Sequence, residues 1–88
     1  MMAVIKKKVW LKYFDDVASG KKKFELRLND FDIKEGDTLI LEEWNPIIGE
    51  YTGRKIEKKV SYVFKFDLNT FGQEKEIRGK GLQVISLE

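Results

Sequence analysis

The segment from Ser19 to Arg27 contains the residues whose types and spacing best suit chemistry, in the pattern Gly20-x-Lys22-x-x-Glu25-x-Arg27. Glu25 and Arg27 are two positions apart, so on a strand their side chains project from the same face. A carboxylate beside a guanidinium can present an acceptor and a bidentate donor to a base edge, a sugar or a phosphate. It can equally form a solvated ion pair that stabilises little. The spacing alone leaves both interpretations open.

A second group of candidate residues, Trp44, Tyr51 and Arg54, flanks a loop containing Pro46. An exposed aromatic ring beside an arginine is a stacking platform for a nucleobase. The alternative is that Trp44 belongs to the core and Tyr51 caps a hairpin. Lys6–Lys8 and Lys58–Lys59 either contact phosphate or serve as solubilising charge.

The composition excludes many kinds of chemistry. The 88 residues include no His and no Cys, which removes disulfides, thiol nucleophiles, Cys/His zinc sites and imidazole catalysis. The phosphate-binding loop, the dinucleotide fingerprint and the nucleophile elbow are also absent. We therefore expect no cofactor and no metal. The N-terminal apolar residues are interrupted by three lysines, so they do not resemble a signal peptide, and no segment suits a membrane span. These features predict a cytoplasmic protein.

The charge is arranged in blocks that the net charge of +2 conceals. Residues 1–23 carry seven Lys and two Asp, whereas residues 24–50 carry two basic and eight acidic residues. Residues 51–66 are basic again, with five Lys or Arg and one Glu. If folding brings the two basic segments together, the protein has a positive face suited to nucleic acid. If it does not, the lysines form an ordinary solvated surface.

The hydrophobic pattern predicts a single domain over residues 1–88. Alternation predicts strands over 3–9, 21–28, 38–44, 54–66 and 81–87. Helical spacing predicts a helix over 11–19 that Gly20 ends. Residues 67–80 are irregular and could include a second helical turn. We expect a mostly β fold with one or two short helices, in which a small, mostly antiparallel barrel is plugged by the helix. The predicted core includes Phe14, Phe24, Phe64 and Phe66, with Tyr62 also pointing inward.

The pattern from Gly20 to Arg27 resembles the G-x-K-x-x-E-x-R signature of the ASCH domain, a branch of the PUA-like superfamily. The surrounding sequence is also similar, over nearly the whole chain, to a compact bacterial and phage sub-branch of uncharacterised ASCH-like proteins. The similar segments are Tyr13-Phe14-Asp15, Asn29-Asp30, Gly36-Asp37, Glu43-Trp44-Asn45-Pro46 and Gly49-Glu50-Tyr51-Thr52-Gly53-Arg54.

This resemblance implies a PUA-like β-barrel and a function in RNA binding. It places Lys22, Glu25 and Arg27 along a cleft between helix and barrel, with Gly20 shaping the entrance. Some ASCH-like enzymes hydrolyse N4-acetylcytidine; they share the lysine at Lys22 but have a nucleophilic threonine where this chain has Glu25.

We therefore expect a module that binds RNA or a modified nucleoside through Gly20, Lys22, Glu25, Arg27, Trp44, Tyr51 and Arg54. The alternative is a small amidohydrolase-like enzyme acting on a modified nucleoside, with the amine of Lys22 as base or nucleophile. A third possibility is a domain that docks a protein partner through its strand edges or aromatic surface.

Overall fold

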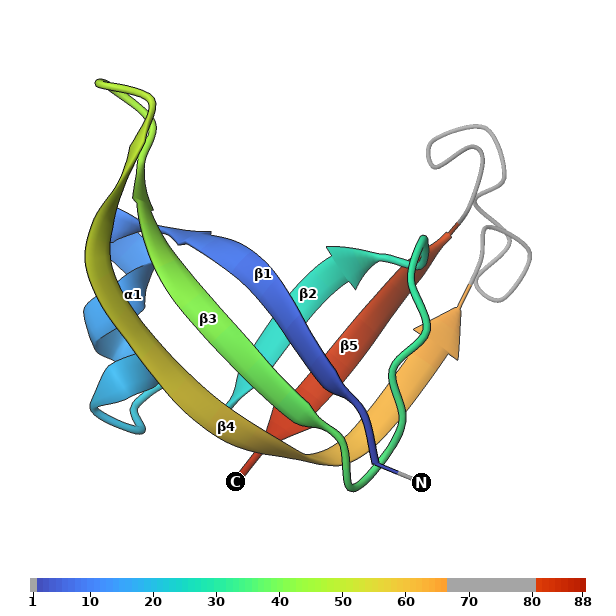
Figure 1. The fold of residues 1–88 in the computed structure, drawn as a ribbon. Coiled ribbons are helices and arrows are strands. Elements are labelled where there is room, and N and C mark those ends of the chain that lie inside the picture. The colour runs from blue at the N-terminus through green and yellow to red at the C-terminus, as the bar shows by residue number, and fades with distance from the viewer. Residues whose placement is uncertain (1, 67–80) are drawn as a thin grey trace.

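A computed structural model describes residues 2–66 and 81–88 of the chain (Figure 1). The described residues form five strands and one helix: β1 (Val4–Trp10), α1 (Leu11–Ala18), β2 (Phe24–Leu28), β3 (Thr38–Asn45), β4 (Glu50–Phe66) and β5 (Leu82–Leu87). This agrees with the predicted mostly β fold containing a short helix. The predicted irregular segment 67–80, with its possible second helical turn, lies outside the described residues.

The strands form one mixed sheet in the order β1-β3-β4-β5-β2. β1 and β3 are parallel, and the other three pairs are antiparallel. β4 joins the two halves, because its first part pairs with β3 and its last part with β5. It begins at Glu50 rather than at the predicted Arg54, since the β3–β4 turn closes tightly with the N–H of Gly49 donating to the carbonyl of Asn45.

The sheet curves strongly but does not close into a barrel. Its two edge strands, β1 and β2, approach each other without forming a backbone ladder in the described ranges. A side chain spans the space instead: Nη2 of Arg27 on β2 donates to the backbone carbonyl of Lys8 on β1. We call this open junction between β1 and β2 the seam. The expected barrel is therefore incomplete, because charged side chains occupy the place of a ladder.

The core lies on the inner face of the curved sheet and under α1. The helix buries Phe14 and Val17, as its spacing predicts, and Gly20 ends the segment with a φ of 82°. The buried apolar cluster comprises Val9, Phe14, Val17, Ile33, Leu39, Leu41, Val60, Ile85 and Leu87. No helix in the described part of the chain is long and apolar enough to cross a bilayer.

Two predicted core residues, Phe24 and Phe64, are exposed to 47% and 41%. On β2 the apolar residues face outward and Glu25 faces inward, so the expected orientation of this strand is reversed. On β4 the register shifts between Val60 and Tyr62, where one extra residue makes a β-bulge. A bulge exchanges the faces of the residues that follow it. Tyr62 and Phe64 therefore point outward, and Val63 packs against the core.

Candidate ligand-binding cleft

A hollow of about 450 Å³ opens along the seam. The end of β1, the start of α1 and the strand β2 form its walls. Because α1 follows β1 without an intervening loop, the last residues of β1 and the first turn of α1 lie together. The residues that line the hollow are Lys8, Val9, Trp10, Tyr13, Lys22, Glu25, Leu26 and Arg27. Three residues of the predicted signature therefore meet in one cleft, which we call the seam cleft.

Glu25 is the centre of the polar network in this cleft and is only 3% exposed. Its Oε2 accepts a hydrogen bond of 2.9 Å from Nε of Arg27, whose Nη2 lies 2.8 Å from the same oxygen. Its Oε1 lies 3.5 Å from Nζ of Lys22. A buried carboxylate is strongly disfavoured unless it is paired in this way. Glu25 therefore fixes both cations, and Arg27 in turn reaches the β1 backbone across the seam.

Gly20 does not line the cleft, but it determines where Lys22 lies. Its positive φ allows the chain to reverse after α1. The N–H of Lys22 then donates to the carbonyl of Asp16 at 2.8 Å, which holds the turn against the helix. The Lys22 ammonium lies 5.3 Å from the ring centre of Tyr13. Tyr13 and Trp10 are 42% and 51% exposed, so the cleft has accessible aromatic rings.

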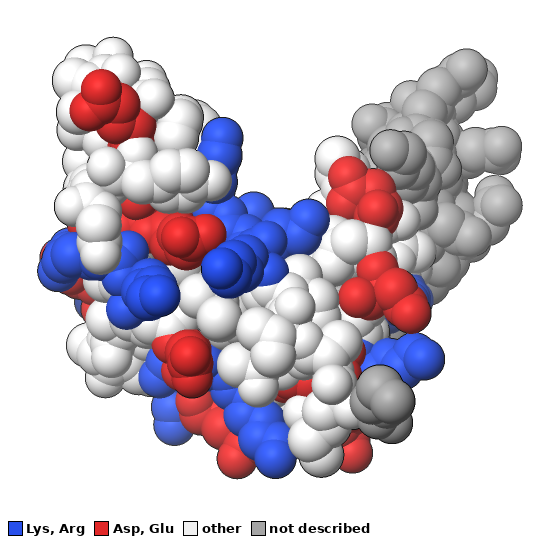
Figure 2. All heavy atoms as spheres, viewed as in Figure 1, with Lys and Arg blue, Asp and Glu red and all other residues white. Residues whose placement is uncertain are grey.

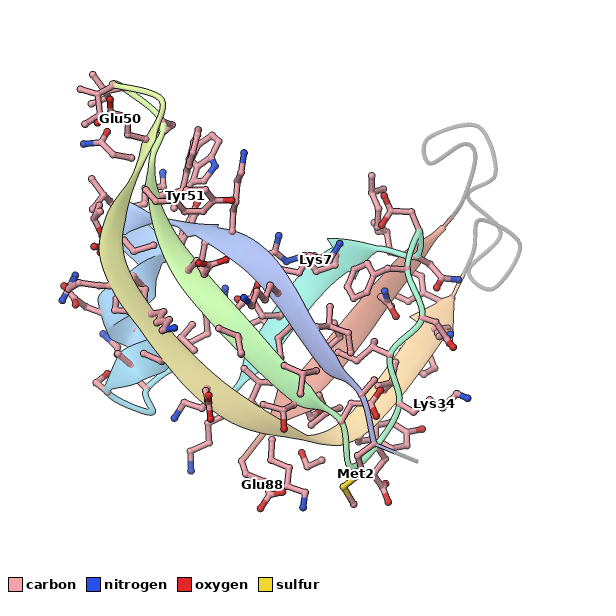
Figure 3. The ribbon with its side chains drawn as sticks, viewed as in Figure 1. Met2, Lys7, Lys34, Glu50, Tyr51 and Glu88 are labelled. Carbon is pink, nitrogen blue, oxygen red and sulfur yellow. The ribbon has the colours of Figure 1, made fainter. Side chains whose placement is uncertain are left out.

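A second hollow of about 390 Å³ adjoins the first and shares Lys8 and Arg27 with it. Its lining residues are Lys6, Lys7, Lys8, Arg27, Glu42 and Tyr51. Figure 2 shows Lys and Arg side chains gathered at the base of the projecting β3–β4 hairpin. In Figure 3, Tyr51 lies at the base of this hairpin and Lys7 lies between β1 and β2. The two hollows form a basic track along β1.

Trp44 and Tyr51 come together at one end of this track. Their rings meet edge to face with centroids 4.8 Å apart, and Nζ of Lys8 lies 3.8 Å from the Trp44 ring centre. Trp44 is partly buried, whereas Tyr51 is 51% exposed. Tyr51 is therefore the more accessible ring of the pair.

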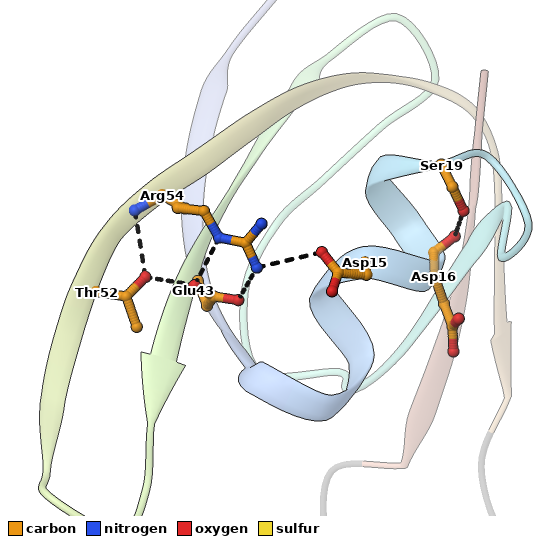
Figure 4. A network of polar contacts seen from close by, with 6 residues as sticks. All are labelled: Asp15, Asp16, Ser19, Glu43, Thr52 and Arg54. Carbon is orange, nitrogen blue, oxygen red and sulfur yellow. Dashed lines mark hydrogen bonds and ion pairs between the residues drawn. The ribbon is translucent and has the colours of Figure 1, made fainter.

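Arg54 belongs to a different network and lines neither hollow (Figure 4). Its Nε and Nη2 donate to the carboxylate of Glu43 at 2.9 and 2.5 Å, and Nη2 also reaches Asp15 on α1 at 3.1 Å. Glu43 is 1% exposed and also accepts a hydrogen bond from Thr52. The Arg54 guanidinium holds the pKa of Glu43 below its usual value, and Glu43 raises the pKa of Arg54. Arg54 thus ties α1 to β3 and β4.

Tyr13 and Glu43 were not among the predicted site residues, and Lys8 was considered only as one of the three lysines Lys6–Lys8; the structure makes all three residues prominent. Lys8 joins both hollows, Tyr13 gives the seam cleft an exposed ring, and Glu43 holds Arg54. A signal existed for Glu43, because Glu42 and Glu43 are consecutive on an apolar strand and alternation must turn one of them inward. The sequence does not distinguish Lys8 from Lys6 and Lys7, because its role in both hollows depends on the approach of β2.

The composition of the cleft limits its chemistry. Neither Ser nor Thr is among the residues that line either hollow. Within residues 2–66 and 81–88, no cluster of three or more acidic side chains is placed to hold a metal ion. The side chains present can bind anions and stack on rings, which are the properties of a binding site.

The described residues form a small fold built from one curved mixed sheet, with a cleft lined by Lys and Arg side chains between its edge strands. The chain belongs to the family described as a domain of unknown function, DUF3850, whose model matches residues 5–77. It is 48% identical over 64 residues to the "Uncharacterized 12.9 kDa protein in GpA 3'region" of Escherichia phage P2. That match covers 72% of this chain and 57% of the phage protein, so the chain spans little more than half of that relative's length.

A crystal structure of hypothetical protein PH0355 has a similar fold. The TM-score is 0.64 at 21% sequence identity, and the alignment covers 99% of this chain and 98% of that one. At this identity the likeness concerns the fold alone.

Proposed function

We propose that this protein is an ASCH-like member of the PUA-like superfamily and that it binds RNA or a modified nucleoside in the seam cleft. The observation that carries the proposal is that Lys22 and Arg27 pair with the single buried carboxylate of Glu25 in a cleft that Lys8 also lines. Three cations against one carboxylate leave a positive cleft. Glu25 holds Lys22 and Arg27 in place, so a phosphate meets donors that are already oriented.

The size and the aromatic content of the cleft support the same ligand class. About 450 Å³ falls within the range of small-molecule sites and suits a nucleotide. The exposed rings of Tyr13 and Trp10 offer faces on which an unpaired base can stack. Stacking on a protein ring contributes about 1–3 kcal/mol per base to the binding of single strands.

The second hollow favours a ligand longer than one nucleoside. Lys8 and Arg27 belong to both hollows, so a strand that leaves the seam cleft passes directly over Lys6 and Lys7 towards Tyr51. An extended single strand can place phosphates on the lysines of β1 and a base on the Tyr51 ring. A free nucleoside would occupy only the seam cleft.

The cleft favours binding over hydrolysis. The resembled amidohydrolases use a threonine nucleophile, yet neither Ser nor Thr is among the residues that line the cleft, and both oxygens of Glu25 are engaged by cations. We expect no release of acetate from N4-acetylcytidine beyond that seen with Lys22→Ala. Hydrolysis by the wild-type protein that Lys22→Ala abolishes would support the enzymatic alternative instead.

The test is fluorescence anisotropy with labelled single-stranded RNA of mixed sequence and about 12 nucleotides. If about three phosphates are neutralised, the affinity falls about 20-fold between about 50 and 200 mM KCl. Lys8→Ala should weaken binding and reduce the salt dependence by about one phosphate. Lys34→Ala is the matched control, because this exposed lysine lies on the loop before β3 and away from the cleft (Figure 3).

Calorimetric titration with N4-acetylcytidine covers the second ligand class. Binding of the nucleoside with no detectable affinity for RNA would restrict the function to the seam cleft alone. Failure of a folded wild-type protein to bind either ligand at low salt would refute the proposal.

A further inference from the structure

The second hollow contains one acidic side chain, Glu42, whose presence the binding of phosphate does not explain. The other charged residues that line this hollow are basic: Lys6, Lys7, Lys8 and Arg27. Because like charges repel, a phosphate of a bound strand does not lie against the Glu42 carboxylate. The ligand group that meets Glu42 must instead donate hydrogen bonds, since an ionised carboxylate only accepts them.

The Glu42 carboxylate is available to a ligand. Glu42 is half-buried on β3, and its neighbours in the sheet register are Lys8 on β1 and Lys55 on β4. Within residues 2–66 and 81–88, neither lysine forms an ion pair with it. Nζ of Lys8 lies instead 3.8 Å from the ring centre of Trp44. Both oxygens of Glu42 can therefore accept hydrogen bonds from a bound molecule.

Tyr51 supplies an aromatic ring beside this carboxylate. Glu42 and Trp44 are two positions apart on β3 and share a face, and Tyr51 pairs with Trp44 across the sheet. The edge-to-face contact with Trp44 orients the Tyr51 ring, which remains 51% exposed. Two residues of a strand span about 7 Å. A base stacked on Tyr51 can therefore extend its edge to Glu42.

We propose that the second hollow binds an unpaired guanine of a single-stranded RNA, stacked on Tyr51 and recognised by Glu42. The inference rests on the proposed function and adds a base preference to it. Guanine has two adjacent donors on its Watson–Crick edge, N1–H and N2–H, which match the two oxygens of a carboxylate. Adenine and cytosine have an acceptor beside their amino group, and uracil has a carbonyl on each side of its single N–H. The hollow, of about 390 Å³, has room for a purine.

The test is fluorescence anisotropy at about 50 mM KCl with single-stranded RNAs of about 12 nucleotides. One RNA is oligouridine, and the others carry one internal guanosine, adenosine or cytidine. We expect the guanosine RNA to bind about 10-fold more tightly than oligouridine and more tightly than the other two, because a bidentate contact to the correct base discriminates by about this factor. Tyr51→Ala, with its fold checked by circular dichroism, should weaken binding of the guanosine RNA about 5-fold or more.

Glu42→Gln separates base recognition from charge. Loss of the negative charge raises the affinity for all the RNAs alike, whereas the amide presents one acceptor and one donor and no longer matches guanine. We expect the preference for the guanosine RNA over oligouridine to fall from about 10-fold to less than about 2-fold. Glu50→Gln is the matched control. It removes the same charge from the exposed tip of the β3–β4 hairpin, outside the hollow, and should keep the preference (Figure 3).

Equal affinity of the wild-type protein for all the RNAs would overturn the inference and leave the proposed function standing. A preference for a base other than guanine, or a guanosine preference that Glu42→Gln retains, would also overturn it. If the folded wild-type protein binds none of the RNAs, the proposed binding of RNA is refuted and this inference with it.

Discussion

Replacing Glu43 by Gln tests whether the Glu43–Arg54 network holds the helix to the sheet. The substitution keeps the side-chain volume and therefore creates no cavity, but it removes the charge. The carboxylate accepts two hydrogen bonds from Arg54 and one from Thr52. An amide presents one oxygen and a donor group, so at least one of these donors loses its acceptor.

The expected loss is about 2–3 kcal/mol. A hydrogen bond to a charged group contributes about 1.5–3 kcal/mol, and removing one partner of a buried pair costs about 3–5 kcal/mol. The expected loss lies at or below the lower end of the buried-pair range, because the Arg54 side chain is 54% exposed and keeps its ion pair with Asp15. In a chain of this size the loss lowers the melting temperature by about 10–20 °C.

Urea unfolding at several pH values measures this loss and its origin. The folded-state pKa of Glu43 is lowered chiefly by the Arg54 hydrogen bonds. Its contribution to stability is therefore complete above the unfolded pKa of about 4.3 and disappears as the pH falls through the folded value. The difference between wild type and Glu43→Gln should be constant above about pH 5 and should shrink in more acidic solution.

Glu57→Gln is the control, because Glu57 is exposed on the same strand as Arg54 and should change stability by less than about 0.5 kcal/mol. Equal stabilities of wild type and Glu43→Gln at pH 7 would refute the reasoning. A difference that persists undiminished at pH 3 would show that the lost stability does not come from the ionised carboxylate.

Three further substitutions test other parts of the fold. Asp37→Asn should lower the melting temperature at pH 7 but much less near pH 3. The reason is that the backbone N–H groups of Ala3 and Lys34 donate to the Asp37 carboxylate and hold its pKa below the usual value. Thermal unfolding at both pH values measures the difference. Ile85→Ala should cost about 2–5 kcal/mol in urea unfolding, since Ile85 is fully buried. Gly53→Ala should cost about 1–2 kcal/mol through its φ of 96° alone, because no atom lies within 4 Å of an added Cβ; a neutral result in urea unfolding would contradict this backbone conformation.

The sequence by itself determined where the strands and the helix lie and which residues of the Gly20–Arg27 pattern share a face. Alternation and helical spacing located every strand and the helix to within a few residues, because these periods follow from local backbone geometry. The two-residue spacing of Glu25 and Arg27 also placed both side chains on one face, and Gly20 marked the end of α1. These inferences need no knowledge of which elements pack together.

The tertiary structure alone decided which face of each strand is inside. Alternation defines two faces but does not assign either to the core; that assignment depends on the neighbouring strands. Phe24 on β2 is outside because Glu25 meets Lys22 and Arg27 at the seam, and Phe64 on β4 is outside because a bulge precedes it. The bulge is hidden in this sequence because Tyr62, Val63 and Phe64 are all apolar, so the alternation does not show which of them faces inward.

The partners of the charged residues were likewise decided only by the fold. Arg54, which the sequence predicted as a ligand-binding residue, contacts Glu43 and Asp15, which are 11 and 39 positions away along the chain. Lys8 joins the cleft because the curvature of the sheet brings β2 towards β1. Residue types and spacing determine what each side chain can do, but the long-range packing of the curved sheet determines which side chains meet.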